Sequence, residues 1–166
     1  KRLILCGEAV GASDIFRITS ESPYLYYQPV ESLWKNHQKN KFDATFLDDV
    51  VDGCGFEIIK LSALKKSHKE GKSKHRSELC SLYIRENKSK FKINQVSAPK
   101  SLYNKDLRLT VDNPEDLVLC RAVYNKFKKI APKIPLEEII LFLDQNPNLI
   151  KLTYPYTKKG YKLMYL

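Results

Sequence analysis

Apolar residues recur at helical spacing along much of the chain. Leu3, Cys6 and Val10 share one face of a predicted helix over residues 3–10, and Gly11 suits its end. The same spacing predicts further helices over residues 29–39, 61–69, 76–86, 114–131 and 136–143.

Segments rich in β-branched and aromatic residues predict strands between these helices. They cover residues 14–18, 42–51, 56–60, 91–96 and 107–111. Gly53 and Gly55 lie in a turn-forming segment between the second and third strands, which predicts a hairpin or a bulged crossing. Residues 91–96 alternate apolar and polar side chains, as a half-exposed edge strand does. The aromatic and basic tail, residues 153–166, is interpreted as a short strand.

Strands that alternate with helices in this way are typical of an α/β fold. We expect a mostly parallel sheet covered by helices on both faces, which is a three-layer sandwich. A chain of 166 residues has the usual size of one domain, and its hydrophobic content of 43% can supply a core. We therefore predict a single domain over residues 1–166.

The formal net charge of +10 favours partners that bear phosphate groups, such as a nucleotide, a nucleic acid or an anionic membrane. The basic runs, residues 65–76 and 126–133, are not interleaved with rows of aromatic side chains, and lysine-rich faces of this kind are typical of solvated surface. Nucleic-acid binding is therefore the least favoured interpretation.

No segment has the roughly 20 apolar residues that a membrane-spanning helix needs, and the opening apolar run is too short for a signal peptide. We therefore expect a soluble, cytoplasmic protein. The cysteines and histidines show neither a Cys-x-x-Cys pair nor a zinc-binding spacing, so we expect reduced thiols.

Two carboxylates stand beyond the carboxyl ends of predicted strands, where ligands bind in open α/β sheets. Glu21 follows the first strand, and Asp112 precedes a helix that Asn113 and Pro114 are suited to begin. If their strands are neighbours, the pair can share Mg²⁺, which takes one or two carboxylates together with substrate phosphates. Two plainer interpretations stay open: Asp112 as part of the helix cap, and Glu21 as a solvated loop carboxylate.

Residues 108–117 read Arg-Leu-Thr-Val-Asp-Asn-Pro-Glu-Asp-Leu. This segment resembles the signature "R-hydrophobic-T-V-D-T/N-P-E-D-L" of cytidylyltransferases of the spore-coat polysaccharide type, relatives of CMP-3-deoxy-manno-octulosonate and CMP-sialate synthetases. Other segments resemble further family motifs in the same order: residues 16–23 ("R-I-T-G-D-C-P"), 52–58 ("D-G-x-x-x-E-hydrophobic"), 75–87 ("R-E-H-V-T-P-Y-I-R-E-N") and 136–149 (a final helix with "D-x-N-P"). The resemblance spans nearly the whole chain.

The resemblance implies a nucleotide-diphospho-sugar transferase-like fold and a homodimeric nucleotidyltransferase that serves surface polysaccharide biosynthesis. In that chemistry an acceptor oxygen of a sugar or sugar acid attacks the α-phosphate of CTP, or of another nucleotide, and pyrophosphate leaves. Mg²⁺ offsets the charge on the phosphates.

By position, the resemblance makes Asp112 and Glu21 metal ligands. It places four residues on the substrate-binding side: Arg17, Asp52, Glu57 and Arg76. From the residues alone, Arg17 can equally serve a local ion pair, and Asp52 with its following glycine is also a simple turn.

Two departures from the family pattern define the alternatives. The family's Gly-Asp is Ser20-Glu21 here, which keeps the charge, lengthens the ligand and removes a glycine that lets backbone approach a phosphate. The family's nucleotide loop, "A-R-x-x-S-x-R-L-P-G-K", is not found in residues 1–166. We therefore expect the C-terminal portion of the fold, lacking the N-terminal nucleotide-binding half and inactive alone. The alternative is a non-catalytic cytidylyltransferase-like domain used for interaction or regulation.

Overall fold

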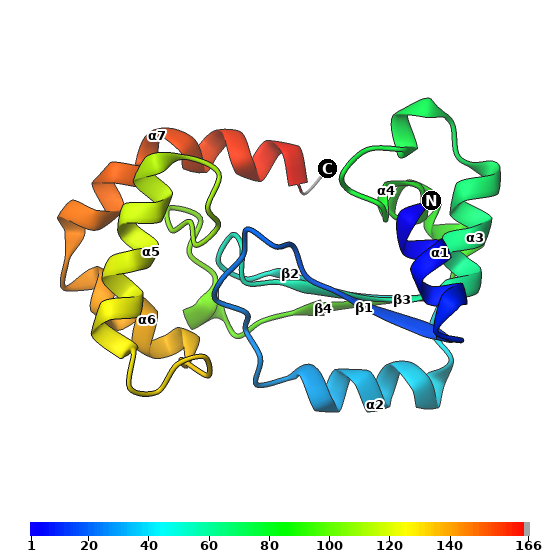
Figure 1. The fold of residues 1–166 in the computed structure, drawn as a ribbon, viewed down its shortest axis with the longest axis horizontal. Helices are drawn as coiled ribbons and strands as arrows, with labels where there is room; N and C mark the ends of the chain where they lie inside the picture. Colours follow the sequence, from blue (N-terminus) through cyan, green and yellow to red (C-terminus); the bar gives the residue numbers. More distant parts are fainter. Residues whose placement is uncertain (165–166) are drawn as a thin grey trace. The chain divides into compact units, whose positions relative to one another are not determined.

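The computed structural model describes residues 1–164, with side chains as far as residue 157, and has an α/β fold (Figure 1). Its strands are β1 (Asp14–Arg17), β2 (Ala44–Asp49), β3 (Phe56–Lys60) and β4 (Ile93–Ser97). Its α-helices are α1 (Arg2–Ala9), α2 (Val30–Asn40), α3 (Leu61–Glu70), α4 (Leu82–Glu86), α5 (Pro114–Phe127), α6 (Leu136–Asp144) and α7 (Pro147–Met164). Short 3-10 turns cover Ser73–His75, Lys88–Lys90 and Lys100–Leu102.

The helical spacing of apolar residues predicted α1, α2, α3, α5 and α6 closely. The helix predicted over residues 76–86 is shorter, and only Leu82–Glu86 is α-helical. One reason lies in the preceding loop, where the carbonyl of Glu78 accepts a hydrogen bond from Arg17 at 3.2 Å. That carbonyl serves a distant side chain instead of a helical turn.

The strands form one sheet in the order β1-β3-β2-β4, and β1 pairs with β3 in antiparallel orientation. The start of β2 meets the end of β3, because the N–H of Lys60 donates to the carbonyl of Asp43. β2 and β4 run in the same direction, since Asp43 is bonded to Lys92 and Asp49 to Ala98. The sheet is therefore mixed, and the expected mostly parallel sheet is not confirmed. A turn as short as that between β2 and β3 joins antiparallel strands, whereas parallel strands need a long crossover.

Two segments predicted as strands have other structures. Residues 107–111 lie outside the sheet: Arg108 makes a single parallel bridge to Asp52, and the N–H of Val111 donates to the carbonyl of Glu21. The tail is helical in α7 as far as Met164, and residues 165–166 lie outside the described part of the chain. α7 packs against α5, and tertiary packing of this kind stabilises helices whose local composition does not predict them.

The chain divides into two compact units, each built from separate stretches of sequence. The first comprises Lys1–Arg17, Glu31–Phe46 and Glu57–Val96. In Figure 1, α2 lies on one side of its strands, and α1 and α3 lie on the other. Its core consists of Ala44, Phe46, Ile59, Ala63, Leu64, Tyr83, Ile84 and Phe91.

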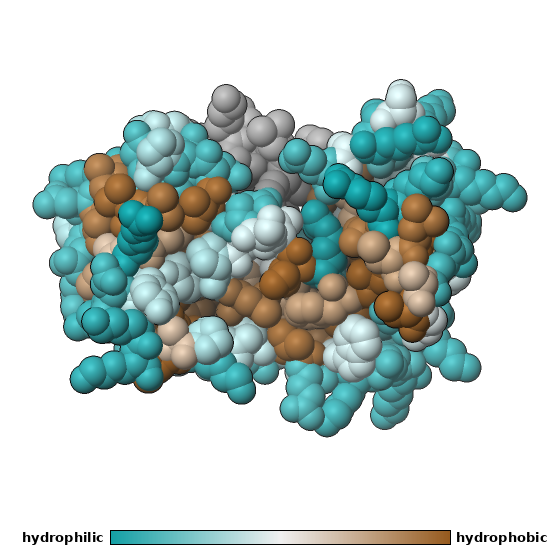
Figure 2. Space-filling view, viewed as in Figure 1, coloured by the Kyte–Doolittle hydropathy of each residue, from teal (hydrophilic) through white to brown (hydrophobic). Residues whose placement is uncertain are grey.

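The second unit comprises Ile18–Val30, Leu47–Phe56 and Ser97–Leu166. Its helices α5 and α6 both pack against α7. Figure 2 shows apolar side chains at the surface over α5, where the exposed residues are Leu117, Val118 and Tyr124. None of the helices in the described residues is long and apolar enough to span a membrane. The single domain over residues 1–166 stays a prediction.

Candidate functional site

Helix α5 begins at a set of hydrogen bonds that its sequence dictates. Asn113 is the N-cap, and Pro114 stands at the first helical position, where its missing N–H leaves no partner unsatisfied. Asp116 reaches back from the first turn, and its carboxylate accepts the backbone N–H groups of Asp112 at 3.0 Å and of Asn113 at 2.9 Å. The backbone of Asp112 is therefore fixed at the N-terminus of a helix, as the sequence predicted.

Arg108 binds three carboxylates beside this helix start. Its Nε donates to Asp116 at 3.0 Å, its Nη1 donates to Asp52 at 3.3 Å, and its Nη2 donates to Asp112. Arg108, Asp116 and Asp52 are buried, whereas the side chain of Asp112 is 52% exposed. One positive and three negative charges leave a surplus of negative charge. The Asp112 carboxylate is the exposed part of that surplus, and a cation can approach it.

The protonation of this cluster depends on burial and on Arg108. Burial opposes the charge of Arg108, but Asp116, Asp52 and Asp112 outweigh burial and raise the pKa of the guanidinium. Burial also favours the neutral form of Asp116, but hydrogen bonds from Arg108 and from the Asp112 N–H lower the pKa of this carboxyl. Burial raises the pKa of Asp52 despite the nearby guanidinium. Asp116 is thus the carboxylate whose charge Arg108 stabilises most clearly.

The loop that carries Glu21 lies against the segment that ends in Asp112. The Glu21 carbonyl accepts the N–H of Val111 at 2.8 Å and the hydroxyl of Thr110 at 3.4 Å. Its carboxylate accepts a hydrogen bond from Ser20 at 3.1 Å. The two carboxylates predicted as metal ligands therefore belong to neighbouring segments of the second unit.

The assignment of Glu21 and Asp112 as Mg²⁺ ligands, in a site that a substrate completes, stays a prediction. Mg²⁺ prefers oxygen ligands and commonly takes one or two carboxylates, with water and phosphate oxygens as the other ligands. Among the described residues there is no group of three or more His, Cys, Asp and Glu that could hold a metal ion by itself. A cation held by these two side chains would thus need phosphate oxygens as well.

Gly53 allows the turn after β2 to approach the segment before α5. Its φ is +87°, and a Cβ at this position would lie 2.7 Å from backbone atoms of Leu109 and Thr110, so only glycine fits. This approach holds Asp52 against Arg108. The described contacts of the Asp52 side chain belong to that buried ion pair, and its direct contact with a substrate stays a prediction.

In the first unit, Glu57 is a buried carboxylate between two arginines. Its Oε2 accepts a hydrogen bond from Arg17 at 2.9 Å, and its Oε1 accepts bonds from Arg85 at 2.9 Å and from the Ser81 hydroxyl at 2.5 Å. The antiparallel register of β1 and β3 places Arg17 opposite Glu57. Glu57 is 5% exposed. It therefore orients two guanidinium groups, and its contacts leave it little freedom to face a ligand.

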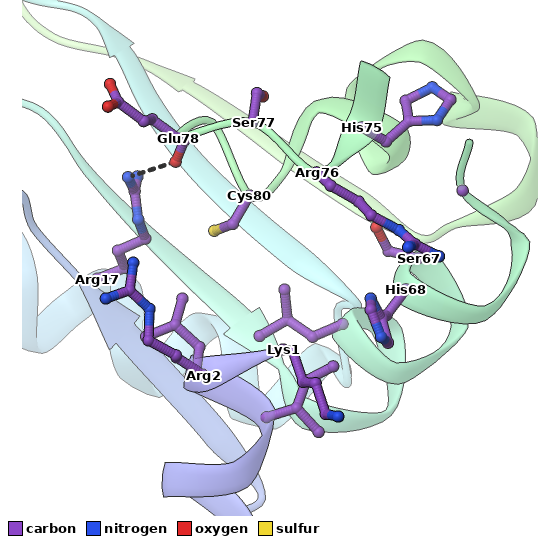
Figure 3. Close-up of a pocket in the computed structure, with 14 residues that line it drawn as sticks. Lys1, Arg2, Arg17, Ser67, His68, His75, Arg76, Ser77, Glu78 and Cys80 are labelled. Carbon is purple, nitrogen blue, oxygen red and sulfur yellow. Dashed lines mark hydrogen bonds between the residues drawn. The ribbon is translucent and has the colours of Figure 1, made fainter. Parts of the chain in front are cut away.

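Arg17 also lines a pocket of about 480 Å³ in the first unit (Figure 3). The positively charged and imidazole side chains of the lining are Lys1, Arg2, Arg17, His68, His75 and Arg76. Glu78 contributes an acidic side chain, which points away from Arg76 and His68 in Figure 3. Two residues predicted to bind substrate, Arg17 and Arg76, therefore share one pocket, and Glu57 supports one of them.

Several residues that hold the predicted site residues in place were not predicted from the sequence. Arg85 and Ser81 complete the shell around Glu57, and Arg108 and Asp116 hold Asp112. All four lie inside the segments that resemble family motifs, residues 75–87 and 108–117. The family motifs in these two segments were the signal that could have identified these four residues.

No family model matches the chain. It is similar to an uncharacterized protein of Methanocaldococcus jannaschii, with 29% identity over 148 residues, and to the spore coat polysaccharide biosynthesis protein SpsF of Bacillus subtilis, with 26% identity over 148 residues. Each match covers 89% of this chain, and the matches cover 60% and 61% of those proteins respectively. The chain thus spans about 60% of the length of the curated relatives it matches.

A solved cytidylyltransferase from Leptospira borgpetersenii serovar Hardjo-bovis has a similar fold. The TM-score is 0.79 at 20% sequence identity, and the match covers 90% of this chain and 63% of that one. The chain therefore has a fold that is seen in a cytidylyltransferase. Together with the similarity to SpsF, this supports the resemblance that the sequence motifs indicated.

Proposed function

We propose that this chain is part of a sugar-activating nucleotidyltransferase of the cytidylyltransferase type, acting in surface polysaccharide biosynthesis. The reaction joins CTP to a sugar or sugar acid and yields a CMP-sugar and pyrophosphate. One observation carries the proposal: within residues 108–117, buried Arg108 holds exposed Asp112 at the start of α5, on a fold like that of a solved cytidylyltransferase.

In this proposal Asp112 and Glu21 hold Mg²⁺. Mg²⁺ held by these two side chains would offset the charge on the nucleotide phosphates during attack by the acceptor oxygen. Arg108 keeps the Asp112 carboxylate in place, and Arg108 is itself anchored by Asp116 and Asp52. Arg108 is therefore a positioning residue and not a catalytic one.

Arg17, Arg76, Glu57 and Asp52 belong to the acceptor side in this proposal. Arg17 and Arg76 line the pocket of the first unit, where they are placed for direct contact with a ligand. Glu57 acts through Arg17, and Asp52 acts through Arg108. The direct roles thus fall to the two arginines that line the pocket, and the supporting roles fall to the two buried carboxylates.

Turnover also requires a nucleotide loop, and the family's loop motif is not found in residues 1–166. We therefore assign the activity to a longer, homodimeric, cytoplasmic protein in which this chain is joined to a nucleotide-binding half. The chain alone is expected to be inactive. Ser20-Glu21, in place of the family's Gly-Asp, favours the second candidate, a non-catalytic interaction or regulatory domain.

The test is pyrophosphate release by a protein in which this chain is joined to its nucleotide-binding half. CTP, Mg²⁺ and a panel of sugars and sugar acids serve as substrates. Release that requires both Mg²⁺ and an acceptor supports the proposal. A folded protein that binds CTP but releases no pyrophosphate with any acceptor supports the non-catalytic candidate. Turnover by the isolated chain would contradict the assignment of the nucleotide site to another part of the protein.

A further inference from the structure

The pocket of the first unit carries positive charge that its own residues do not neutralise. Arg17 donates to Glu57 at 2.9 Å and to the backbone carbonyl of Glu78 at 3.2 Å. The side chains of Arg2, Arg76 and His68 line the same pocket, and none of them has a hydrogen bond or ion pair with another of the described residues. These three groups are therefore available to a ligand.

The remaining polar side chains of the pocket do not change this balance. His75 is engaged on both sides: its Nδ1 accepts the N–H of Lys72 at 2.8 Å, which leaves its Nε2 to donate to Glu86 at 2.7 Å. The carboxylate of Glu78 points away from Arg76 and His68 in Figure 3. Cys80 stays a neutral thiol at physiological pH, because burial raises its pKa to about 11. The pocket thus offers donors and cations with little internal compensation.

We propose that this pocket binds a phosphate group of a small molecule, with Arg76 and His68 as direct donors. Arg17 provides the third side, held in place by Glu57. The donors come from separate elements, namely β1, α3 and the loop before α4, so they can surround a tetrahedral group. A phosphate group offers about two negative charges and three strong acceptor oxygens. A carboxylate carries one charge and is satisfied by a single bidentate arginine. The surplus of cations therefore favours phosphate.

Only the source of the phosphate rests on the proposed function. In that function the pocket lies on the acceptor side, so a phosphorylated acceptor is the expected source, and a nucleotide presents the same chemistry. Phosphate binding itself depends on the pocket alone. The two proposals can therefore fail separately.

The experiment is calorimetric titration of the full chain with inorganic phosphate, a hexose phosphate, CTP and sodium acetate. Arg76→Ala and His68→Gln are compared with Lys69→Ala, which removes an exposed charge from the helix that carries His68. We expect Arg76→Ala to weaken phosphate binding about tenfold, since one charge-assisted hydrogen bond is lost. We expect a smaller loss for His68→Gln and less than about a twofold change for Lys69→Ala. Thermal melts show whether each variant is folded.

Tighter binding of the hexose phosphate than of CTP assigns the pocket to a phosphorylated acceptor, and the reverse assigns it to the nucleotide. Acetate that competes as well as phosphate, or an equal loss in Lys69→Ala and Arg76→Ala, would overturn the phosphate site. Phosphate binding without pyrophosphate release in the longer protein would support the phosphate site and contradict the transferase function. Pyrophosphate release without phosphate binding to the pocket would support the transferase function and contradict the phosphate site.

Discussion

The two units hold charged clusters that are built in opposite ways. In the first unit, one buried carboxylate, Glu57, binds the two arginines Arg17 and Arg85. In the second unit, one buried guanidinium, Arg108, binds the three carboxylates of Asp52, Asp112 and Asp116. In each cluster a single buried charge faces several charges of the opposite sign, so the cluster as a whole carries the sign of its more numerous groups.

Because their net charges differ in sign, the two clusters attract different kinds of ligand. Two positive charges and one negative charge leave the first cluster cationic, next to a pocket with further unpaired cations. One positive and three negative charges leave the second cluster anionic, with one half-exposed carboxylate. An anionic ligand suits the first cluster and a divalent cation suits the second.

Arg108→Met is expected to give the largest loss of stability. It leaves the buried carboxylates of Asp116 and Asp52 without their counter-charge, and removing one partner of a buried ion pair costs about 3–5 kcal/mol. Urea unfolding measures this loss. Arg121→Ala is the matched control, since it removes an exposed arginine from α5 and should change the free energy of unfolding by less than about 0.5 kcal/mol. Equal effects of the two variants would contradict the central role of Arg108.

Glu57→Gln is expected to destabilise less, by about 1.5–3 kcal/mol, the usual range for hydrogen bonds to a charged group. The amide keeps the volume of the side chain, but it removes the charge that faces Arg17 and Arg85. These arginines are partly exposed, so water takes over some of the lost interaction. Glu138→Gln, at an exposed position of α6, is the control. A loss larger than that of Arg108→Met would invert the comparison of the two clusters.

We expect His37 to cause a smaller loss of folding stability as the pH falls. Burial lowers the pKa of His37, although its hydrogen bond to Asp14 opposes this, so the unfolded chain binds a proton more readily than the folded one. The stability contributed by neutral His37 is present above its ordinary pKa of about 6.5 and is lost as the pH falls towards its lower folded value. The fluorescence of Trp34, in the first unit, can follow urea unfolding between about pH 7 and pH 5.

His37→Asn provides the control, because it removes the titrating group. Its stability should depend less on pH over this range than that of the native chain. In the second unit, Asp116 has a lowered pKa, so its contribution persists down to the ordinary carboxyl range near pH 4 and is lost only in stronger acid. An unchanged pH dependence in His37→Asn would show that another group causes it.

The sequence predicted what local interactions determine. The start of α5 follows from Asn113 and Pro114, which act on their own helical turn, and the structure has the helix there. The direction of β3 and the nature of residues 107–111 depend on distant partners, so an apolar run could not distinguish a sheet strand from an extended loop. The helical tail likewise depends on packing against α5.

The candidate site shows the same division. The sequence suggests Asp112 and Glu21 as metal ligands because they follow apolar runs and match motif positions, and this role stays a prediction. The pairing of Glu57 with Arg85 joins residues that are 28 positions apart, and no local pattern indicates such a pair. The sequence favours neither an ion pair nor a ligand contact for Arg17. In the structure Arg17 forms an ion pair with Glu57, and the same side chain also lines the pocket.

Asp112→Asn provides the most direct test of the proposed function, because its expected effect on stability is the smallest. Asp112 is half exposed, and asparagine is also tolerated at helix starts, so we expect a change of less than about 0.5 kcal/mol. Asn113→Ala is the control and should cost about 0.5–2 kcal/mol as the loss of an N-cap. The measurement is titration of Mg²⁺ in the presence of CTP, with the protein that includes the nucleotide-binding half. The account predicts that Asp112→Asn weakens Mg²⁺ binding by about tenfold or more while Asn113→Ala barely changes it. Unchanged Mg²⁺ affinity in Asp112→Asn would contradict the metal site and the mechanism built on it.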